Sequence, residues 1–163
     1  WIYKRVIMSS ANDDIEVNVI LPDLKAGSDK QVLQLVAAEA SLHVNADAEF
    51  LYDGLVHKEA HTPSGIGGGV AILHLQTPRL TKPFMMLARL HERIEFHAVD
   101  NEHVDLVVQL LSPEKDGPLH LCRLAHVSRI FRSERLCAEL RSARDEDGIR
   151  ALLMMPEEWQ IAA

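Results

Sequence analysis

The chain has 163 residues, of which 47% are hydrophobic and 25% are charged, and its formal net charge is −7. This size and composition predict one domain, over residues 1–163, with enough apolar side chains for a hydrophobic core. The acidic charge argues against nucleic acid as a partner, because it repels phosphate backbones, and no apolar run approaches the ~18 residues of a membrane span, so we expect no membrane insertion.

The first third of the chain predicts one strand and two helices. Apolar residues alternate over 15–21, which favours a strand that the following proline ends. Ser28 is a candidate N-cap, and apolar residues at helical spacing predict an amphipathic helix over 29–42. A second helix is expected to begin at Asn45 or Asp47, because both residue types cap helices well.

The middle and end of the chain predict three strands followed by three helices. Strands are expected at 70–75, 84–90 and 104–111, where apolar residues occupy both alternating faces, as in strands that are covered on both sides. Helices are expected from Pro118, from Ser133 and from Asp145. This order favours an α/β fold with a sheet packed between helices.

The helical end of the chain carries two patterns. In the helix from Pro118, helical spacing places five residues on one face: Leu121, Leu124, Ala125, Ser128 and Phe131. Six arginines also fall in these helices: Arg123, Arg129, Arg132, Arg135, Arg141 and Arg144. The simpler interpretation is solvated helix faces that balance the acidic remainder, and the alternative is a docking patch for an acidic partner protein.

His74 is the most informative single residue. It stands at the end of a very apolar strand, where a titratable ring is unusual, although a core histidine bonded to a carbonyl would also explain it. Just upstream, Gly67, Gly68 and Gly69 allow close backbone approach, and their amides could cradle an anion. A tight turn is the alternative, because the run precedes a strand and so fits neither a Rossmann nor a P-loop fingerprint.

Two further residues favour an anion beside His74. His120 lies in the first turn of the helix from Pro118, where free N–H groups and the helix dipole attract a phosphoryl group. Lys58 lies near the end of the second helix, and its charge would offset that of a phosphate. A surface histidine and a solvated lysine are the simpler alternatives.

The compartment is predicted from the cysteines and the first residues. Cys122 and Cys137 lack the spacing of a zinc site, so we expect reduced cysteines and no metal. Residues 1–8 lack the apolar core of a secretory signal. Together these features favour a cytoplasmic protein.

Three segments resemble, in the right order, the mannitol/fructose/nitrogen-regulatory (PtsN-like) type of enzyme IIA of the bacterial phosphotransferase system (PTS). They are GIGGGVAILH at 65–74, a pattern I-x-F-x-A-x-D-x-x-x-V-D-L-V at 94–107, and H-L-x-x-L-A-x-x-x-R at 120–129. The resemblance covers about residues 20–153, which we take as the core of the domain. It implies a mixed β-sheet flanked by helices on both sides, with His74 and His120 in a shallow depression at the sheet's edge.

The same resemblance implies a function for these residues. His74 would accept a phosphoryl group from the phosphohistidine of an HPr-like carrier, and would pass it on or signal with it. His120 would donate a hydrogen bond to a phosphoryl oxygen, with background positive potential from Lys58 and from the amides around Gly67, Gly68 and Gly69. An enzyme IIB, a transporter or a sensor kinase would be the next partner, in sugar transport or nitrogen regulation, and no metal or cofactor is required.

Three positions depart from the family pattern. Leu73 stands where the family has proline, Leu75 where it has a small residue, and Lys58 where it has arginine, whose fork a lysine lacks. They leave open an alternative: an enzyme IIA-like binding module that has lost phosphotransfer and acts by protein contact. The chain is a phosphotransferase only in the first case. A metal-dependent hydrolase is disfavoured, because no HxH or HExxH motif is present.

Overall fold

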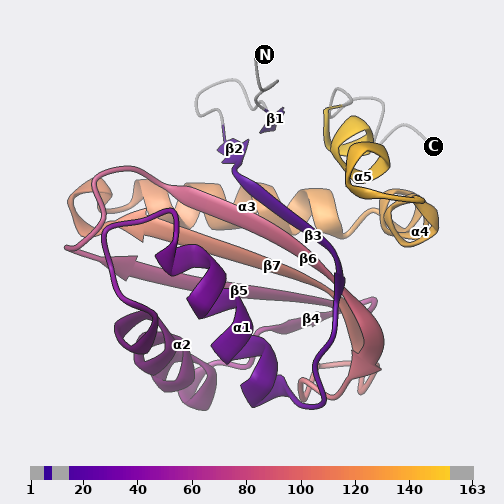
Figure 1. Cartoon of the computed structure of the whole chain (residues 1–163), viewed down its shortest axis with the longest axis horizontal. Helices are drawn as coiled ribbons and strands as arrows, with labels where there is room; N and C mark the ends of the chain where they lie inside the picture. The colour runs from indigo at the N-terminus through magenta and orange to yellow at the C-terminus, as the bar shows by residue number, and fades with distance from the viewer. Residues whose placement is uncertain (1–5, 9–14, 155–163) are drawn as a thin grey trace.

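The structure is a computed structural model that describes residues 6–8 and 15–154. Its centre is a mixed five-stranded sheet with the strand order β3-β6-β7-β5-β4 (Figure 1). The strands are β3 Val19–Leu24, β4 Gly65–Gly67, β5 Val70–Thr77, β6 Phe84–Ile94 and β7 Val104–Pro113. The pairs β3–β6 and β5–β7 are parallel, whereas β6–β7 and β4–β5 are antiparallel.

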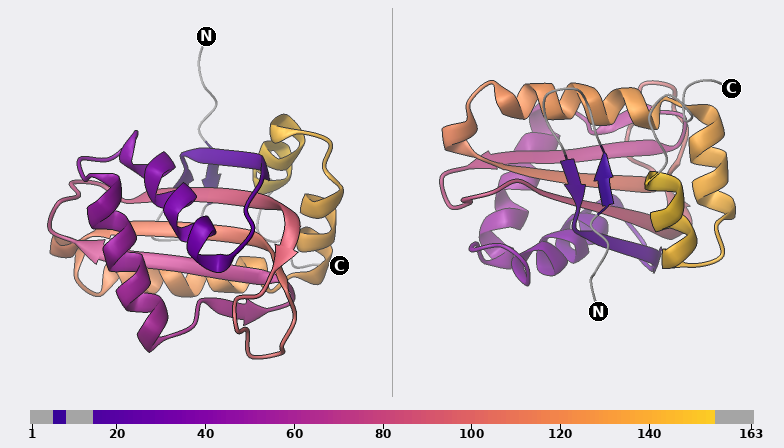
Figure 2. Two further views of the ribbon diagram at one scale, coloured as in Figure 1. Left: turned by 60° about the horizontal axis from the view of Figure 1, so that its bottom comes forward. Right: turned by 90° about the horizontal axis from the view of Figure 1, so that it is seen from above.

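Helices cover both faces of this sheet, so the predicted fold class is confirmed (Figure 2). On one face lie α1 Asp29–Ser41 and α2 Ala48–His61; on the other lie α3 Leu119–Phe131, α4 Glu134–Ser142 and α5 Glu146–Leu153, preceded by the 3-10 turn Glu114–Asp116. Side chains of Ser28, Asp47, Ser133 and Asp145 cap four of these helices. Within the described ranges, no helix is both long and apolar enough to cross a bilayer.

The start of the chain differs from the single strand predicted at 15–21. Two short strands, β1 Val6–Met8 and β2 Ile15–Val17, pair antiparallel, and β3 begins after Asn18. Asn18 interrupts the strand because its backbone N–H and side-chain oxygen both bond to the backbone of Met85, at 2.8 and 2.9 Å. The following proline, Pro22, does not end β3, because an edge strand tolerates a residue without an N–H.

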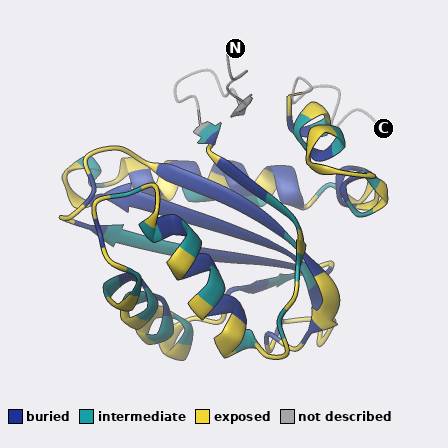
Figure 3. Ribbon diagram, in the orientation of Figure 1, coloured by how far each residue is buried: buried dark blue, intermediate teal, exposed yellow. Residues whose placement is uncertain are grey.

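The expected strand at 70–75 becomes β5, which is buried over 70–73 and half-buried over 74–76 (Figure 3). Its side chains alternate between two cores. Ala71 and Leu73 face α1 and α2, whereas Val70 and Ile72 face α3, α4 and α5. Because successive side chains of a strand point to opposite faces, the next residue, His74, points toward α3.

The face of α3 predicted from the sequence is buried only in part: Phe131 is buried and Leu124 packs against the core. Leu121 is 64% exposed and Ala125 is also exposed, while the buried residues include His120, Arg123, Val127 and Ile130. These four residues also follow helical spacing, so periodicity allowed either face. Polar His120 and Arg123 can be buried because each finds hydrogen-bond partners in the interior.

Candidate functional site

His74 lies on a stretch of β5 that has β7 on one side and an open edge on the other. It is in parallel register with Leu110 of β7. On the opposite edge, β4 pairs with β5 only near Val70 and Ala71, and the last backbone bond there runs from Ile72 N–H to the carbonyl of Ser64, at 2.9 Å. The side chain of His74 is therefore partly exposed at the end of β4.

The ring of His74 meets the ring of His120, 46 residues further along the chain. Nδ1 of His74 lies 3.1 Å from Nε2 of His120, and the ring centroids are 5.3 Å apart. His120 is only 3% exposed, so it is fixed behind His74. Within the described ranges, Nε2 of His74 has no hydrogen-bond partner, which leaves this nitrogen available for chemistry.

Three residues behind His120 hold its ring in place. Nδ1 of His120 lies 2.8 Å from Oγ of Ser112. Arg123 donates to the same Oγ at 3.3 Å and to the carboxylate of Asp116 at 2.8 Å. A buried guanidinium with a carboxylate partner is thus built into the site.

Sequence patterns alone did not identify Ser112, Asp116 and Arg123 as part of the site. One signal was available, because Arg123 follows His120 by three residues and so shares its helix face. The contact with Ser112 depends on how α3 packs on β7, which no local pattern encodes.

Both histidines are held neutral. Burial, the charge of Lys58 and the neighbouring His120 together lower the pKa of His74 to about 4. Burial and the positive charges of Lys58 and Arg123 also lower the pKa of His120 below its usual value. Each ring therefore carries one proton at neutral pH. When the ring proton of His74 is on Nδ1, that N–H donates a hydrogen bond to Nε2 of His120. The lone pair on Nε2 of His74 is then free.

Lys58 and His74 line one cavity of about 140 Å³, together with Ser64, Thr62 and Leu124. Lys58 lies in the last turn of α2, which runs on to His61 rather than ending at the lysine. The carboxylate of Glu59 is held in place by the backbone N–H of Ser64, which donates to both of its oxygens at 3.2 Å. The structure thus places Lys58 and His120 near His74.

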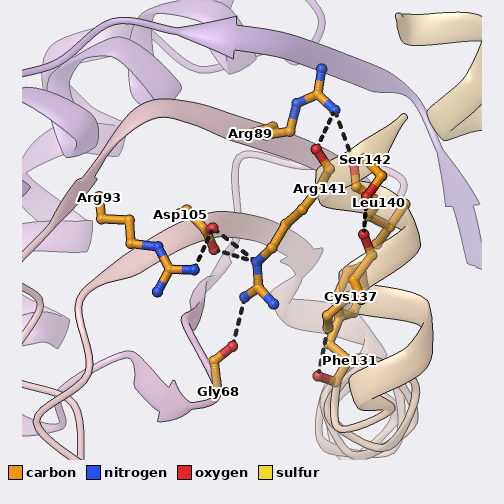
Figure 4. A network of polar contacts seen from close by, with 10 residues as sticks. Gly68, Arg89, Arg93, Asp105, Phe131, Cys137, Leu140, Arg141 and Ser142 are labelled. Carbon is orange, nitrogen blue, oxygen red and sulfur yellow. Dashed lines mark hydrogen bonds and ion pairs between the residues drawn. The ribbon is translucent and has the colours of Figure 1, made fainter. Parts of the chain in front are cut away.

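The glycine run lies elsewhere, at the opposite end of β5. Gly67, Gly68 and Gly69 all have positive φ and turn the chain from β4 into β5, and they line a different cavity. The N–H of Gly68 is taken by Asp100 at 2.9 Å, and its carbonyl accepts from Arg141 at 2.6 Å (Figure 4). Their position does not support the expected contribution of these amides to a phosphate site beside His74.

Close packing explains why this segment is rich in glycine. A Cβ on Gly65 would lie 2.8 Å from the backbone Cα of Ala98, so β4 can reach this position only without a side chain. A Cβ on Gly69 would meet the guanidinium of Arg141 at 2.6 Å. The run is therefore a structural turn, in line with the simpler of the two sequence interpretations.

Two departures from the family pattern, Leu73 and Leu75, point away from the His74 face. Leu73 is buried in the core under α1 and α2. Since Ile72 N–H points to Ser64, the N–H of Leu73 points to β7, and a proline there would remove a ladder bond. Leu75 packs on α2 where Gly54 makes room for it: a Cβ on Gly54 would be 2.8 Å from a Leu75 methyl group. Neither leucine crowds the exposed side of His74.

The six arginines of the last helices do not form one solvated face. Arg123 is buried, and Arg141 binds the carboxylate of Asp105 at 2.8 Å. Arg135 pairs with Glu139 along its own helix at 3.1 Å. At least two of the six arginines, Arg123 and Arg141, therefore make structural contacts within the domain.

Comparisons with known proteins identify the family of this chain. The family described as "Phosphoenolpyruvate-dependent sugar phosphotransferase system, EIIA 2" matches residues 15–155. A nitrogen regulatory protein of Bradyrhizobium diazoefficiens is 38% identical over 144 residues, 88% of this chain and 94% of that protein. A fructose-specific EIIA component of Haloferax volcanii is 30% identical over 132 residues, 81% of this chain and 84% of that protein.

Solved structures show the same fold. The nitrogen regulatory protein IIA-Ntr from Neisseria meningitidis superposes with a TM-score of 0.78 at 24% identity, over 83% of this chain and 92% of that one. IIA mannitol from Escherichia coli superposes with a TM-score of 0.67 at 17% identity, over 82% of this chain and 94% of that one. The chain belongs to the EIIA 2 family of the phosphoenolpyruvate-dependent sugar phosphotransferase system, with a phosphocarrier or regulatory role in that system.

Proposed function

We propose that the chain carries a phosphoryl group on Nε2 of His74, received from the phosphohistidine of an HPr-like carrier. The observation that carries this proposal is the contact between Nδ1 of His74 and Nε2 of His120, at 3.1 Å. It occupies one ring nitrogen of His74 and leaves the other free. The lowered pKa of His74, about 4, keeps that nitrogen unprotonated at neutral pH, as a nucleophile must be.

The transfer is one displacement at phosphorus. The lone pair of His74 Nε2 forms the new N–P bond, while the N–P bond of the carrier breaks and its electron pair returns to the carrier's ring. The proton on Nδ1 of His74 stays there and is donated to His120, whose own lowered pKa disfavours its becoming a cation. A protonated Nδ1 also makes the His74 ring a better leaving group for onward transfer.

The proposed role of His120 thus differs from that expected from the sequence. Its Nε2 faces a ring nitrogen of His74, so it would accept from Nδ1 rather than donate to a phosphoryl oxygen. Arg123 and Ser112 would fix this orientation. Lys58 would offset the charge of the phosphoryl group from across the cavity, as a single charge without the bidentate fork of an arginine.

The 38% identity with a nitrogen regulatory protein supports a regulatory output. The phosphorylation state would then be sensed by a further protein, such as an enzyme IIB, a transporter or a sensor kinase. The solved complex of IIA mannitol with phosphorylated IIB mannitol from Escherichia coli is a precedent for contact with an enzyme IIB. A cytoplasmic location stays a prediction.

The test is intact mass after incubation with phosphoenolpyruvate, enzyme I and an HPr-like carrier. We expect one acid-labile gain of about 80 Da, the mass of a phosphoryl group, that is lost in His74→Ala. His91→Ala is the matched control, because His91 is an exposed histidine paired with Asp23 on β3 and should leave the gain intact. No gain in the unmodified chain, with carriers of both the sugar and nitrogen branches, would instead support the binding module.

A further inference from the structure

Ser64 holds a buried hydroxyl that has no partner. The residue is 8% exposed, and its Oγ makes no hydrogen bond within the described part of the chain. Its backbone, in contrast, is fully used: the N–H is bound by Glu59, and the carbonyl accepts from Ile72 at 2.9 Å. A buried hydroxyl without a partner is unfavourable, so its presence requires a reason.

The position of Ser64 suggests that reason. In the antiparallel pairing of β4 with β5, Gly65 is opposite Ala71, which places Ser64 opposite Ile72. Opposite residues share a face of the sheet, and Ile72 shares its face with His74. Ser64 and His74 are therefore diagonal neighbours, with Cα atoms about 7–8 Å apart.

Ser64 also lines the cavity that holds Lys58 and His74. Lys58 approaches this cavity from the last turn of α2, and Ser64 from the residue just before β4. The carboxylate of Glu59 lies in the same wall and would repel an anion, so a hydrogen-bond donor is needed to orient one there.

We propose that Oγ of Ser64 donates a hydrogen bond to an oxygen of the phosphoryl group on His74, and so orients it for transfer. This inference rests on the proposed function. The phosphoryl group would give Oγ of Ser64 the acceptor that the described part of the chain does not provide. A neutral donor orients the group without adding a second positive charge, which keeps onward transfer possible.

The experiment compares the rate of phosphorylation by the carrier in Ser64→Ala, Ser64→Thr and Ser142→Ala. Ser142 is the matched control, because its hydroxyl bonds to the carbonyl of Ala138 within α4. A hydrogen bond to a charged group corresponds to a fall of about ten- to a hundredfold for Ser64→Ala. Ser64→Thr, which keeps a hydroxyl, should restore most of the rate, and Ser142→Ala should not change it.

The melting temperature separates this role from a structural one. Since Oγ of Ser64 has no partner to lose, Ser64→Ala should melt at the same temperature as the unmodified chain or higher. A serine that served only the fold would instead lower the melting temperature and leave the rate per folded molecule unchanged. That result would overturn the proposal, as would an unchanged rate at an unchanged melting temperature.

The two proposals fail differently. If the unmodified chain is phosphorylated and Ser64→Ala is equally fast, only the role of Ser64 is lost. If no carrier phosphorylates the chain, inorganic phosphate is titrated and the amide shifts of Ser64 and Lys58 are followed by NMR. Binding that Ser64→Ala weakens would support the anion contact, whereas absence of binding would overturn it.

Discussion

Polar and charged groups gather at both ends of β5, but they are hydrogen-bonded to different extents. At the start of the strand, glycines with positive φ lie beside Arg141 and Asp105; at the other end, His74 lies beside Lys58 and His120. The sequence predicted one anion site beside His74 that combined the glycine amides with Lys58 and His120. In the structure, one end has its polar groups bonded to one another and the other leaves some without partners.

The polar groups at the glycine end satisfy each other. Gly68 donates to Asp100. Its carbonyl accepts from Arg141, and Arg141 in turn binds Asp105, which also pairs with Arg93 at 3.5 Å (Figure 4). At the other end, Nε2 of His74 and Oγ of Ser64 have no partner within the described ranges. Unsatisfied groups beside a cavity, more than the residue types themselves, distinguish the site for a ligand from a structural network.

The largest effect expected on transfer, after loss of His74 itself, comes from His120. His120→Ala removes the acceptor that keeps the proton of His74 on Nδ1 and orients its ring, and misplacement of a reacting group can lower a rate by about 100-fold. We expect the phosphorylation rate to fall by about that factor, measured by rapid quench and intact mass.

His120→Gln provides the control, because its amide can reach the same ring nitrogen without titrating. It should retain more of the rate than His120→Ala at similar stability. Equal rates for both variants and the unmodified chain would remove His120 from the mechanism.

At the glycine end, Arg141→Ala should lower the stability of the fold and leave the phosphorylation rate unchanged. The change leaves Asp105 short of its main partner and the carbonyl of Gly68 without its donor, at a cost of about 2 kcal/mol in the free energy of unfolding. Urea denaturation measures this cost, and the phosphorylation rate per folded molecule should not change. A loss of rate at unchanged stability would show that the contrast between the two ends is mistaken.

The smallest effect concerns the charge of Lys58 and its influence on His74. Burial is the largest cause of the lowered pKa of His74, and Lys58 is the next. Lys58→Gln should therefore raise this pKa from about 4 but leave it below 6.5, which NMR titration of the ring nitrogens measures directly.

The same shift makes stability depend on pH. The unfolded chain protonates His74 near 6.5 and the folded chain only near 4, so the unfolded state binds more protons between these values. The contribution of neutral His74 to the free energy of unfolding is fully present above pH 6.5 and is lost as the pH falls toward 4. His74→Ala should weaken this dependence, and a His74 that titrates near 6.5 in the folded chain would contradict the account.

Local patterns identified much of this protein. Helical spacing and capping residues placed α1, α2, α4 and α5, and three apolar runs placed the central strands β5, β6 and β7. His74 and His120 stood out because a titratable ring at the end of an apolar strand and another at a helix start are both unusual. These features depend on residues within one or two turns or strand periods of each other, which a sequence displays directly.

Contacts between distant segments settled the rest. The inward face of α3, the separation of the glycine turn from His74, and the burial of Ser64 all depend on how helices and strands pack. Helical periodicity allowed α3 to turn either Leu121 or His120 inward, and partners on β5 and β7, for His120 and Arg123, fixed the choice. A polar residue can be buried only where the folded chain supplies its hydrogen bonds, and those partners lie far away in the sequence.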